Sequence, residues 1–270
     1  MDEGRPRVVV VMPAYNPAKT LERTYRDLPK EVVDKVILVD DVSQDETVEV
    51  AEHLGIEVVV HVQNTGYGGN QKTCYLEALA DGADVVVMLH PDYQYDSRLV
   101  PQLIGPILDG RADMVLGSRL LGGGTLAGGM PVYKYLSNRF LTVVENWAFG
   151  THLSECHTGF RAYSRPLLET IPFLLNSDNF VFDSQVIAQA VAFRFRIDEI
   201  AVPTRYFPEA SSVRLFAGIV YGLSTLSVVA RYLFHRTGLV RRPEYSKTLS
   251  QVISRHHRAR LLRSSTREDR

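Results

Sequence analysis

The chain has 270 residues, of which 45% are hydrophobic, and its 30 Lys and Arg residues nearly balance its 31 Asp and Glu residues. This length suits one large α/β domain with additions or two small domains, and the hydrophobic content suits a packed core. A net charge of −1 gives no nucleic-acid footprint, so we predict no nucleic-acid partner.

The two cysteines, Cys74 and Cys156, provide neither a disulfide framework nor the spacing of a metal site. The first residues, MDEGRPR, lack the apolar segment of a signal peptide, and no run of about 18 uninterrupted apolar residues predicts a transmembrane helix. We therefore expect a cytoplasmic protein.

Short apolar runs alternate with helical patterns along the first 120 residues. The expected strands cover residues 8–12, 34–41, 56–62, 83–89 and 112–119. The expected helices cover residues 18–28, about 71–80 and 97–109, and one more begins at the capping pair Ser43 and Glu46 and stops at Gly55. This alternation predicts an α/β fold with a mostly parallel sheet covered by helices.

The second half of the chain is less regular. We expect a mobile glycine-rich loop over residues 121–130, helices over 131–149 and 180–195, a strand-like stretch with a turn over 157–165, and a strand over 195–203. Ligands of such sheets bind beyond the carboxyl ends of the strands, so the chemistry is expected there.

Polar segments follow the first two strands. Pro13 and Tyr15, in PAYN, could form the floor under a base or ribose, or an ordinary turn. Asp41 could bind a nucleobase N–H or a ribose hydroxyl, whereas Asp45 is better explained as a helix N-terminal acid. Gly66, in NTGYGGN, allows close approach of the backbone to a ligand, although this segment is neither a Walker A loop nor a Rossmann fingerprint.

The segment HPDYQYD follows the fourth strand. Asp92 can reach both a divalent cation and a diphosphate there, and Gln94 and His90 could add ligands. Oxygen-rich ligands suit Mg²⁺ or Mn²⁺, and the alternative is a capped, solvent-facing turn. After the fifth strand, Arg119 could clamp phosphate oxygens or make a surface ion pair, and the same pair of interpretations applies to Arg161.

Seven segments carry a resemblance to a known family. They are VVVMPAYNP, ILVDDVSQDET, NTGYGG, VVVMLHPDYQYD, MVLGSR, ECHTGFRAYSR and EIAVPTRYFPEASSV, in order over about residues 7–213. Together they resemble glycosyltransferase family 2 on the GT-A nucleotide-sugar fold, and most closely the polyprenyl-phosphate sugar synthases, a group that includes dolichol-phosphate mannose synthase. The resemblance implies a nucleoside diphosphate sugar donor such as GDP-mannose or UDP-glucose, Mg²⁺ or Mn²⁺, and inversion at the anomeric carbon.

The resemblance also implies roles for individual residues. Pro13, Tyr15 and Asp41 match positions that contact the base and ribose, and Asp92 and Gln94 match the metal-binding segment. Arg119 matches a phosphate-binding arginine, and Lys134 lies near a basic helix position. Arg205 matches the arginine on the acceptor side. His90 stands where the family usually has Asp, which removes one carboxylate. We expect either a lower metal affinity or a preference for a metal that tolerates imidazole, such as Mn²⁺.

The nature of the acceptor decides whether a base is needed. A lipid phosphate is already ionised near neutral pH, and Arg205 and Lys134 would position it. A hydroxyl acceptor requires a carboxylate base, for which Asp183 and Glu155 are candidates. The alternatives to a polyprenyl-phosphate enzyme are a soluble family 2 transferase acting on a glycan or small-molecule hydroxyl, and a non-catalytic nucleotide-sugar-binding homologue.

We expect a catalytic domain over residues 1–213, an amphipathic helical segment over 214–245 and a basic, flexible tail over 246–270. Residues 215–234 are mostly apolar but are interrupted by hydroxyl side chains, glycines and an arginine. This pattern favours either an interfacial helix on anionic lipid or a core or dimer-interface helix. We expect peripheral membrane contact on the cytoplasmic side, and a homo-oligomer is possible.

Overall fold

The computed structural model describes residues 4–123, 125–126, 128–203 and 215–253. Within these residues seven strands form one sheet, in the order β3-β2-β1-β4-β6-β5-β7. The strands are β1 (Val8–Ala14), β2 (Lys35–Asp40), β3 (Glu57–Val60), β4 (Val85–Met88), β5 (Met114–Ser118), β6 (Arg161–Ser164) and β7 (Ile197–Ala201). All neighbouring pairs are parallel except the two that β6 makes with β4 and β5. The predicted mostly parallel α/β sheet is confirmed.

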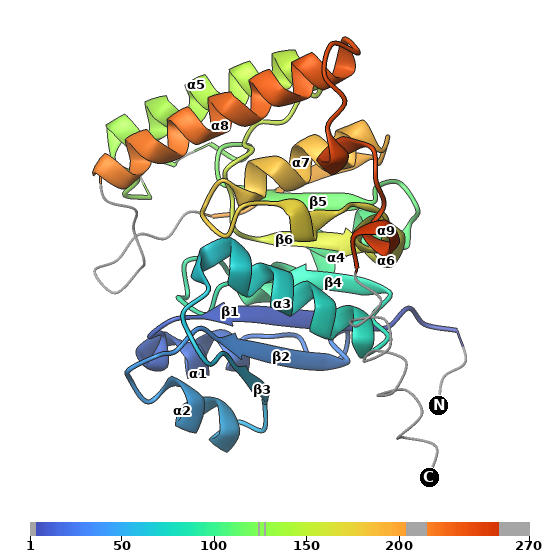
Figure 1. The fold of residues 1–270 in the computed structure, drawn as a ribbon. Coiled ribbons are helices and arrows are strands. Elements are labelled where there is room, and N and C mark those ends of the chain that lie inside the picture. The colour runs from blue at the N-terminus through green and yellow to red at the C-terminus, as the bar shows by residue number, and fades with distance from the viewer. Residues whose placement is uncertain (1–3, 124, 127, 204–214, 254–270) are drawn as a thin grey trace.

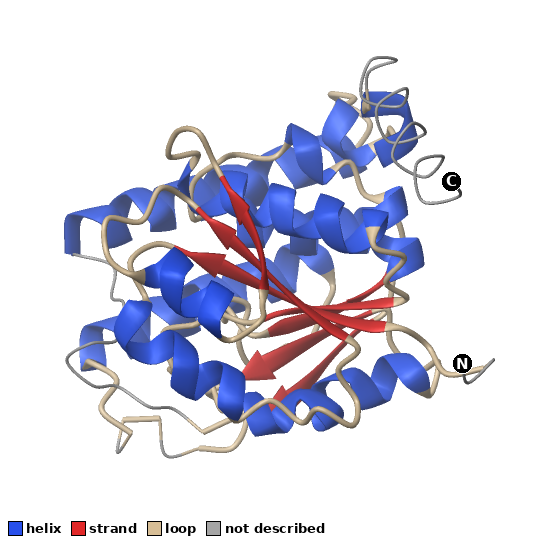
Figure 2. Ribbon diagram, turned by 90° about the horizontal axis from the view of Figure 1, so that it is seen from below, coloured by secondary structure: helices blue, strands red, loops and turns tan. Residues whose placement is uncertain are grey.

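Helices cover both faces of the twisted sheet, as Figure 2 shows. They are α1 (Ala18–Arg26), α2 (Thr47–His53), α3 (Gly66–Ala80), α4 (Val100–Leu108), α5 (Val132–Phe149), α6 (Arg165–Thr170), α7 (Phe182–Ala192), α8 (Leu215–Arg236) and α9 (Leu249–Val252). Short 3-10 turns lie at η1 (Ser97–Leu99), η2 (Phe173–Leu175) and η3 (Pro243–Tyr245).

Two apolar cores lie on opposite faces of the sheet. Alternate residues of β1 divide between them: Val9 and Val11 face one core, and Val8 and Val10 face the other. The first core is completed by α3, α5, α6, α7 and α8, and the second by α1, α2 and α4. Strands buried on both faces explain why their sequences are continuous apolar runs instead of alternating ones.

Helix α8 packs on the rest of the protein instead of standing apart from it. Val228, Val229 and Tyr232 belong to the first core, and the Tyr232 ring meets Phe149 of α5 edge to face at 5.1 Å. The expected domain boundary at residue 213 lies outside the described residues and stays a prediction. No helix in the described part of the chain combines the length and the apolarity that crossing a bilayer requires.

Of two local predictions at the N-termini of helices, one was wrong and one is confirmed. Ser43 and Glu46 form no capping box, because the Ser43 hydroxyl accepts a hydrogen bond from the Asn16 N–H instead. The Asp45 carboxylate accepts from the N–H groups of Thr47 and Ala18, which confirms its structural interpretation and joins the starts of α1 and α2.

Helix α3 begins at Gly66, five residues before the predicted start at about residue 71. The glycines are placed by protein packing: a Cβ on Gly66 would lie 2.7 Å from the Asp178 carbonyl oxygen, and one on Gly68 would lie 2.4 Å from that of Ser177. The glycine-rich segment is therefore the first turn of a helix pressed against another loop.

Candidate active site at the carboxyl edge of the sheet

Backbone strain is concentrated in the loops at the carboxyl ends of three strands. Among the described residues four that are not glycine have positive φ, and three of them follow β1, β2 and β4: Asn16 (57°), Val42 (66°) and Tyr93 (60°). A β-branched residue such as Val42 rarely adopts this conformation. Residues held in such conformations cluster at functional sites, which points to this edge of the sheet.

The two tyrosines of HPDYQYD are anchors for the loop after β4. Tyr93 is buried, its hydroxyl donates to the Asp27 carboxylate over 2.7 Å, and the Arg23 guanidinium lies 4.1 Å from its ring centroid. The buried Tyr95 hydroxyl accepts from the Gly159 N–H over 2.8 Å. Between these anchors Asp92 and Gln94 are half-buried, so the loop holds the two predicted oxygen ligands at the rim of the sheet.

His90 belongs to a polar network at the end of β4. Its ring stacks on Tyr67 of α3, and its Nε2 lies 3.3 Å from the Tyr67 hydroxyl, which donates to Asp183 of α7 over 2.8 Å. Burial lowers the pKa of His90, although the Asp92 and Asp183 carboxylates act in the opposite direction. A neutral imidazole is the form that can accept a hydrogen bond or bind a metal.

Arg161, which the sequence left open as a surface ion pair, is fully buried. Its Nη2 lies 3.4 Å from the Asp183 carboxylate, and its guanidinium also donates to the carbonyl oxygens of Thr158 and Cys156. The surface interpretation was therefore wrong. Asp183 also accepts from Gln71 over 3.3 Å. With these donors around it, Asp183 serves the buried network and is poorly placed to take a proton from an acceptor hydroxyl.

Arg119, at the end of β5, is held by the buried carboxylate of Glu155. The Arg119 backbone N–H donates to Glu155 Oε2 over 2.7 Å, its Nε donates to Oε1 over 3.0 Å, and its Nη2 bonds to Oε1 as well. Burial opposes ionisation of Glu155, but Arg119 outweighs this and holds the pKa of the carboxyl below its usual value. Glu155 is therefore the ionised partner of Arg119, which disfavours its use as a general base.

Lys134, in the first turn of α5, lies close enough to Arg119 for the guanidinium charge to affect the pKa of Lys134. Burial lowers the pKa of Lys134, and repulsion from Arg119 lowers it further. The fold thus places Lys134 within electrostatic range of Arg119, near the carboxyl end of β5.

Asp41, after β2, accepts hydrogen bonds at the start of α3. The N–H groups of Thr65 and Gly66 donate to its two oxygens over 2.7 and 3.0 Å, and His61 Nδ1 lies 2.8 Å from Oδ1. Burial opposes ionisation, but these hydrogen bonds outweigh it and lower the pKa of Asp41. The carboxylate fixes the N-terminus of α3, and its predicted contact with a base or ribose stays a prediction.

The model of the family described as "Glycosyl transferase family 2" matches residues 9–171, more than half of the chain. The chain belongs to this family. The chain is 26% identical over 216 residues to the UDP-N-acetylglucosamine--dolichyl-phosphate N-acetylglucosaminyltransferase of Methanococcus voltae, covering 74% of this chain and 86% of that one. It is 26% identical over 221 residues to the undecaprenyl-phosphate mannosyltransferase of Micrococcus luteus, covering 79% and 89%.

The fold is also shared with solved structures. Glucosyl-3-phosphoglycerate synthase from Mycobacterium tuberculosis, in a complex with Mn²⁺, UDP-glucose and glycerol 3-phosphate, superposes with a TM-score of 0.66 at 20% identity, covering 84% of this chain and 80% of that one. The same enzyme with phosphoglyceric acid gives a TM-score of 0.67 at 22% identity over the same shares. These likenesses confirm the GT-A fold, and the family membership identifies the chain as a glycosyltransferase.

In this family 2 transferase the strand order brings most of the predicted site residues to one edge. Pro13 is buried within β1, Tyr15 follows that strand with 58% of its surface exposed, and Gly66 opens α3. Strand β6 separates β4 from β5, so the loops carrying Asp92 and Arg119 start about 10 Å apart, two strand spacings. Arg205 lies outside the described residues.

The residues after β4 suit a divalent cation that takes most of its ligands from elsewhere. Asp92 supplies one carboxylate, Gln94 one amide oxygen, and His90 a neutral imidazole. Within the described ranges no cluster of three or more His, Cys, Asp or Glu side chains forms a complete metal cage. This donor set fits Mg²⁺ or Mn²⁺ bound mainly by water and diphosphate oxygens, as is common in nucleotide sites.

One side chain of the site was not found from the sequence. Tyr67 lies in the glycine-rich segment and links His90 to Asp183, but that segment was expected to be a loop. A helix period starting at Gly66 was the only available signal.

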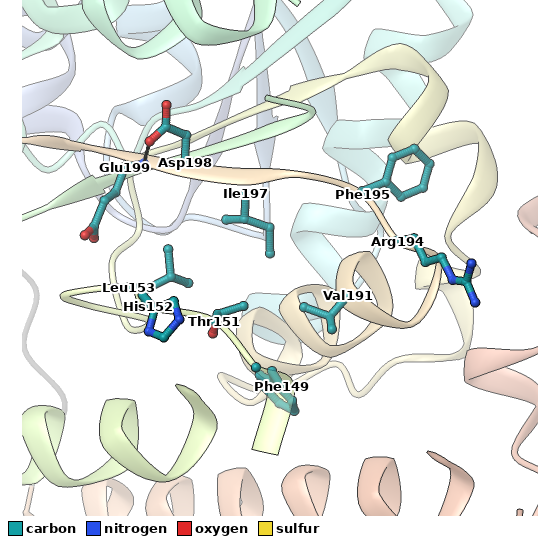
Figure 3. A pocket seen from close by; sticks show the side chains of 11 residues that line it. Phe149, Thr151, His152, Leu153, Val191, Arg194, Phe195, Ile197, Asp198 and Glu199 are labelled. Atoms are coloured by element: carbon teal, nitrogen blue, oxygen red, sulfur yellow. Dashed lines mark hydrogen bonds between the residues drawn. The ribbon is translucent and has the colours of Figure 1, made fainter. Parts of the chain in front are cut away.

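The pocket drawn in Figure 3, about 470 Å³, lies apart from this site, between the C-terminal ends of α5 and α7 and the start of β7. Its lining includes His152, Arg194 and Asp198.

Proposed function

We propose that the chain transfers a hexose, with inversion, from a nucleoside diphosphate sugar to a polyprenyl phosphate, assisted by Mg²⁺ or Mn²⁺. The observation that carries the proposal is that the ends of β4 and β5, which bear the Asp92 loop and Arg119, lie at the same edge of the sheet. Lys134, in the first turn of α5, is within electrostatic range of Arg119. Guanidinium and ammonium donors at the same sheet edge as a carboxylate-bearing loop suit a diphosphate donor and a phosphate acceptor. The relatives that act on dolichyl or undecaprenyl phosphate support this acceptor.

The reaction requires no general base. An ionised oxygen of the lipid phosphate attacks the anomeric carbon, the bond from that carbon to the diphosphate oxygen breaks, and the nucleoside diphosphate leaves with the electron pair. Lys134 would orient the acceptor phosphate, and Arg119 would lie beside the departing diphosphate. A divalent cation held by Asp92, Gln94 and His90 would neutralise charge on the leaving group.

A hydroxyl acceptor is the main rival. It requires a base, and the two carboxylates considered for that role are both engaged: Glu155 with Arg119, and Asp183 with Arg161 and Tyr67. The geometry therefore favours an acceptor that arrives already ionised. A lipid acceptor also implies peripheral contact with a membrane.

The test is a transfer assay over a panel of nucleoside diphosphate sugars, with polyprenyl phosphate, polyprenol and a soluble sugar as acceptors. We expect product only with the phosphate, loss of activity on chelation, and recovery on adding Mn²⁺ or Mg²⁺. Asp92→Asn should abolish metal-dependent donor binding in a thermal-shift assay, because binding stabilises by mass action. Asp109→Asn, at an exposed helix end, is the matched control.

Equal donor binding by Asp92→Asn and the unaltered protein would show that donor binding does not depend on a metal held by Asp92. Transfer to a soluble hydroxyl but not to polyprenyl phosphate would replace the acceptor. The absence of a thermal shift with any nucleotide would contradict the proposed donor, whichever acceptor is considered.

A further inference from the structure

Helices α5 and α8 lie side by side on the outside of α7, and Figure 1 shows them together along one side of the molecule. Each has a buried side toward the body, which includes Leu141 and Ala148 on α5 and Val228 and Val229 on α8. Each also has an outward side, and the outward sides of two adjacent helices form one surface.

The outward sides are apolar. On α5 they consist of side chains that are 59–74% exposed, and on α8 of side chains that are 50–64% exposed. We call this surface the α5–α8 face: Val132, Leu136, Phe140, Val143, Trp147, Ile219, Leu223 and Phe234. Their spacing of three, four or eleven residues places them along one side of each helix. Monomeric soluble proteins rarely expose apolar side chains in such a continuous array.

The exposed charges on α5 and α8 themselves are all positive. Arg139 and Arg236 are exposed, Lys134 is half-buried, and the one carboxylate in the sequences of the two helices, Glu145, is fully buried. An apolar strip with an aromatic indole and a cationic border complements a bilayer that contains anionic lipid. A second copy of this chain would bring the same cations against each other, which disfavours self-association through this face.

We propose that the α5–α8 face lies on the surface of a bilayer containing anionic lipid, with both helices parallel to the membrane plane. The sequence suggested such a role for α8 alone, and the structure adds α5 with Trp147. Because Lys134 is in the first turn of α5 and within electrostatic range of Arg119, that end of the site is then close to the headgroups. This link to catalysis rests on the proposed function, since a lipid phosphate acceptor would be presented there.

The only tryptophan of the chain lies on this face, so its fluorescence reports docking directly. The full chain, without substrates, is titrated with phosphatidylcholine vesicles and with vesicles that also contain phosphatidylglycerol. We expect a blue shift of Trp147 emission, quenching by brominated acyl chains, and co-sedimentation that is stronger with phosphatidylglycerol and weaker at high salt.

The double variant Phe140→Ser, Leu223→Ser should partition roughly a hundredfold more weakly, because each large apolar side chain that leaves water contributes about tenfold. Leu108→Ser, at an exposed apolar side chain of α4, is the matched control and should partition like the unaltered protein. Sedimentation velocity without lipid should show a monomer.

Three results would overturn the proposal: no binding to either vesicle, no quenching by brominated lipid, or a lipid-free dimer that the double variant dissociates. In the last case a second copy occupies the face. Transfer to a short-chain, water-soluble prenyl phosphate separates this proposal from the proposed function. If that transfer persists while vesicle binding is absent, only the docking surface is wrong, and vesicle binding without any transfer leaves the docking surface standing.

Discussion

Replacing Glu155 with glutamine tests whether this carboxylate is what fixes Arg119 at the end of β5. The two oxygens of Glu155 accept from the Arg119 backbone N–H, its Nε and Asn138 Nδ2 over 2.7, 3.0 and 2.7 Å. Glutamine has nearly the same shape, but one oxygen becomes an NH₂ group. In either orientation that NH₂ group faces a donor, and the charge of Arg119 loses its partner.

The magnitude follows from burial. Glu155 is fully buried, and removing one partner of a buried ion pair costs about 3–5 kcal/mol. The Arg119 side chain retains 13% exposure, so water compensates it in part and the lower end of that range, about 3 kcal/mol, is expected. For a chain of this size the midpoint of thermal unfolding should fall by roughly 6–9 °C.

The pH dependence gives a second readout. Because the pKa of Glu155 is held below its usual value in the folded protein, its stabilisation is present above the unfolded pKa of about 4.3. It is lost as the pH falls through the folded pKa. The stability difference between the unaltered protein and Glu155→Gln should therefore be constant near neutral pH and shrink below about pH 4.3.

Urea unfolding and calorimetry measure both effects, and Glu169→Gln is the matched control. Glu169 pairs with Arg165 one helical turn away, but half of its side chain is exposed, so its loss should cost less than about 0.5 kcal/mol. Equal unfolding midpoints for the two variants would show that Glu155 does not anchor Arg119. A difference that persists unchanged at low pH would show that its charge is not the cause.

Three further substitutions test the surroundings of the site. Gly159→Ala places a Cβ 2.7 Å from His90 Cδ2, so we expect about 1–3 kcal/mol of destabilisation by urea titration and weaker Mn²⁺-dependent donor binding. Unchanged donor binding would show that His90 does not bind the metal. Asp183→Asn leaves the fully buried Arg161 without its charge partner and should cost about 3–5 kcal/mol, whereas a loss below 1 kcal/mol would contradict the network. Val42→Gly relieves the positive φ and should stabilise by about 1 kcal/mol, and a clear destabilisation would show that the loop is not strained.

The sequence predicted the sheet because its signals there are local. Continuous apolar runs between helical patterns require helices on both faces, and the polar segments after those runs had to meet at one edge. Periodicity does not give strand direction, so the antiparallel insertion of β6 between β4 and β5 was not predictable. Asp92 and Arg119 were expected to share an edge, but not to be separated by a third strand.

The wrong predictions share a physical cause, which is tertiary contact that overrides local preference. Gly66 is a poor helix former, yet α3 starts there because the Asp41 carboxylate accepts its N–H and the Asp178 carbonyl leaves no room for a side chain. Arginine is rarely buried, yet Arg161 is, because Asp183 and two carbonyl groups surround its guanidinium.

The same contacts decide how charge is distributed over the site. Because Glu155 neutralises Arg119 inside the protein, in the proposed mechanism Arg119 would bring hydrogen-bond donors to a diphosphate but little net charge. In the proposed mechanism, charge on the departing diphosphate would then be neutralised mainly by a divalent cation beside Asp92. A fold that fixes its arginine with a buried carboxylate gains a rigid hydrogen-bond donor and leaves charge neutralisation to groups that approach with the substrate. Binding of the nucleotide sugar should therefore depend on the metal more strongly than on the arginine.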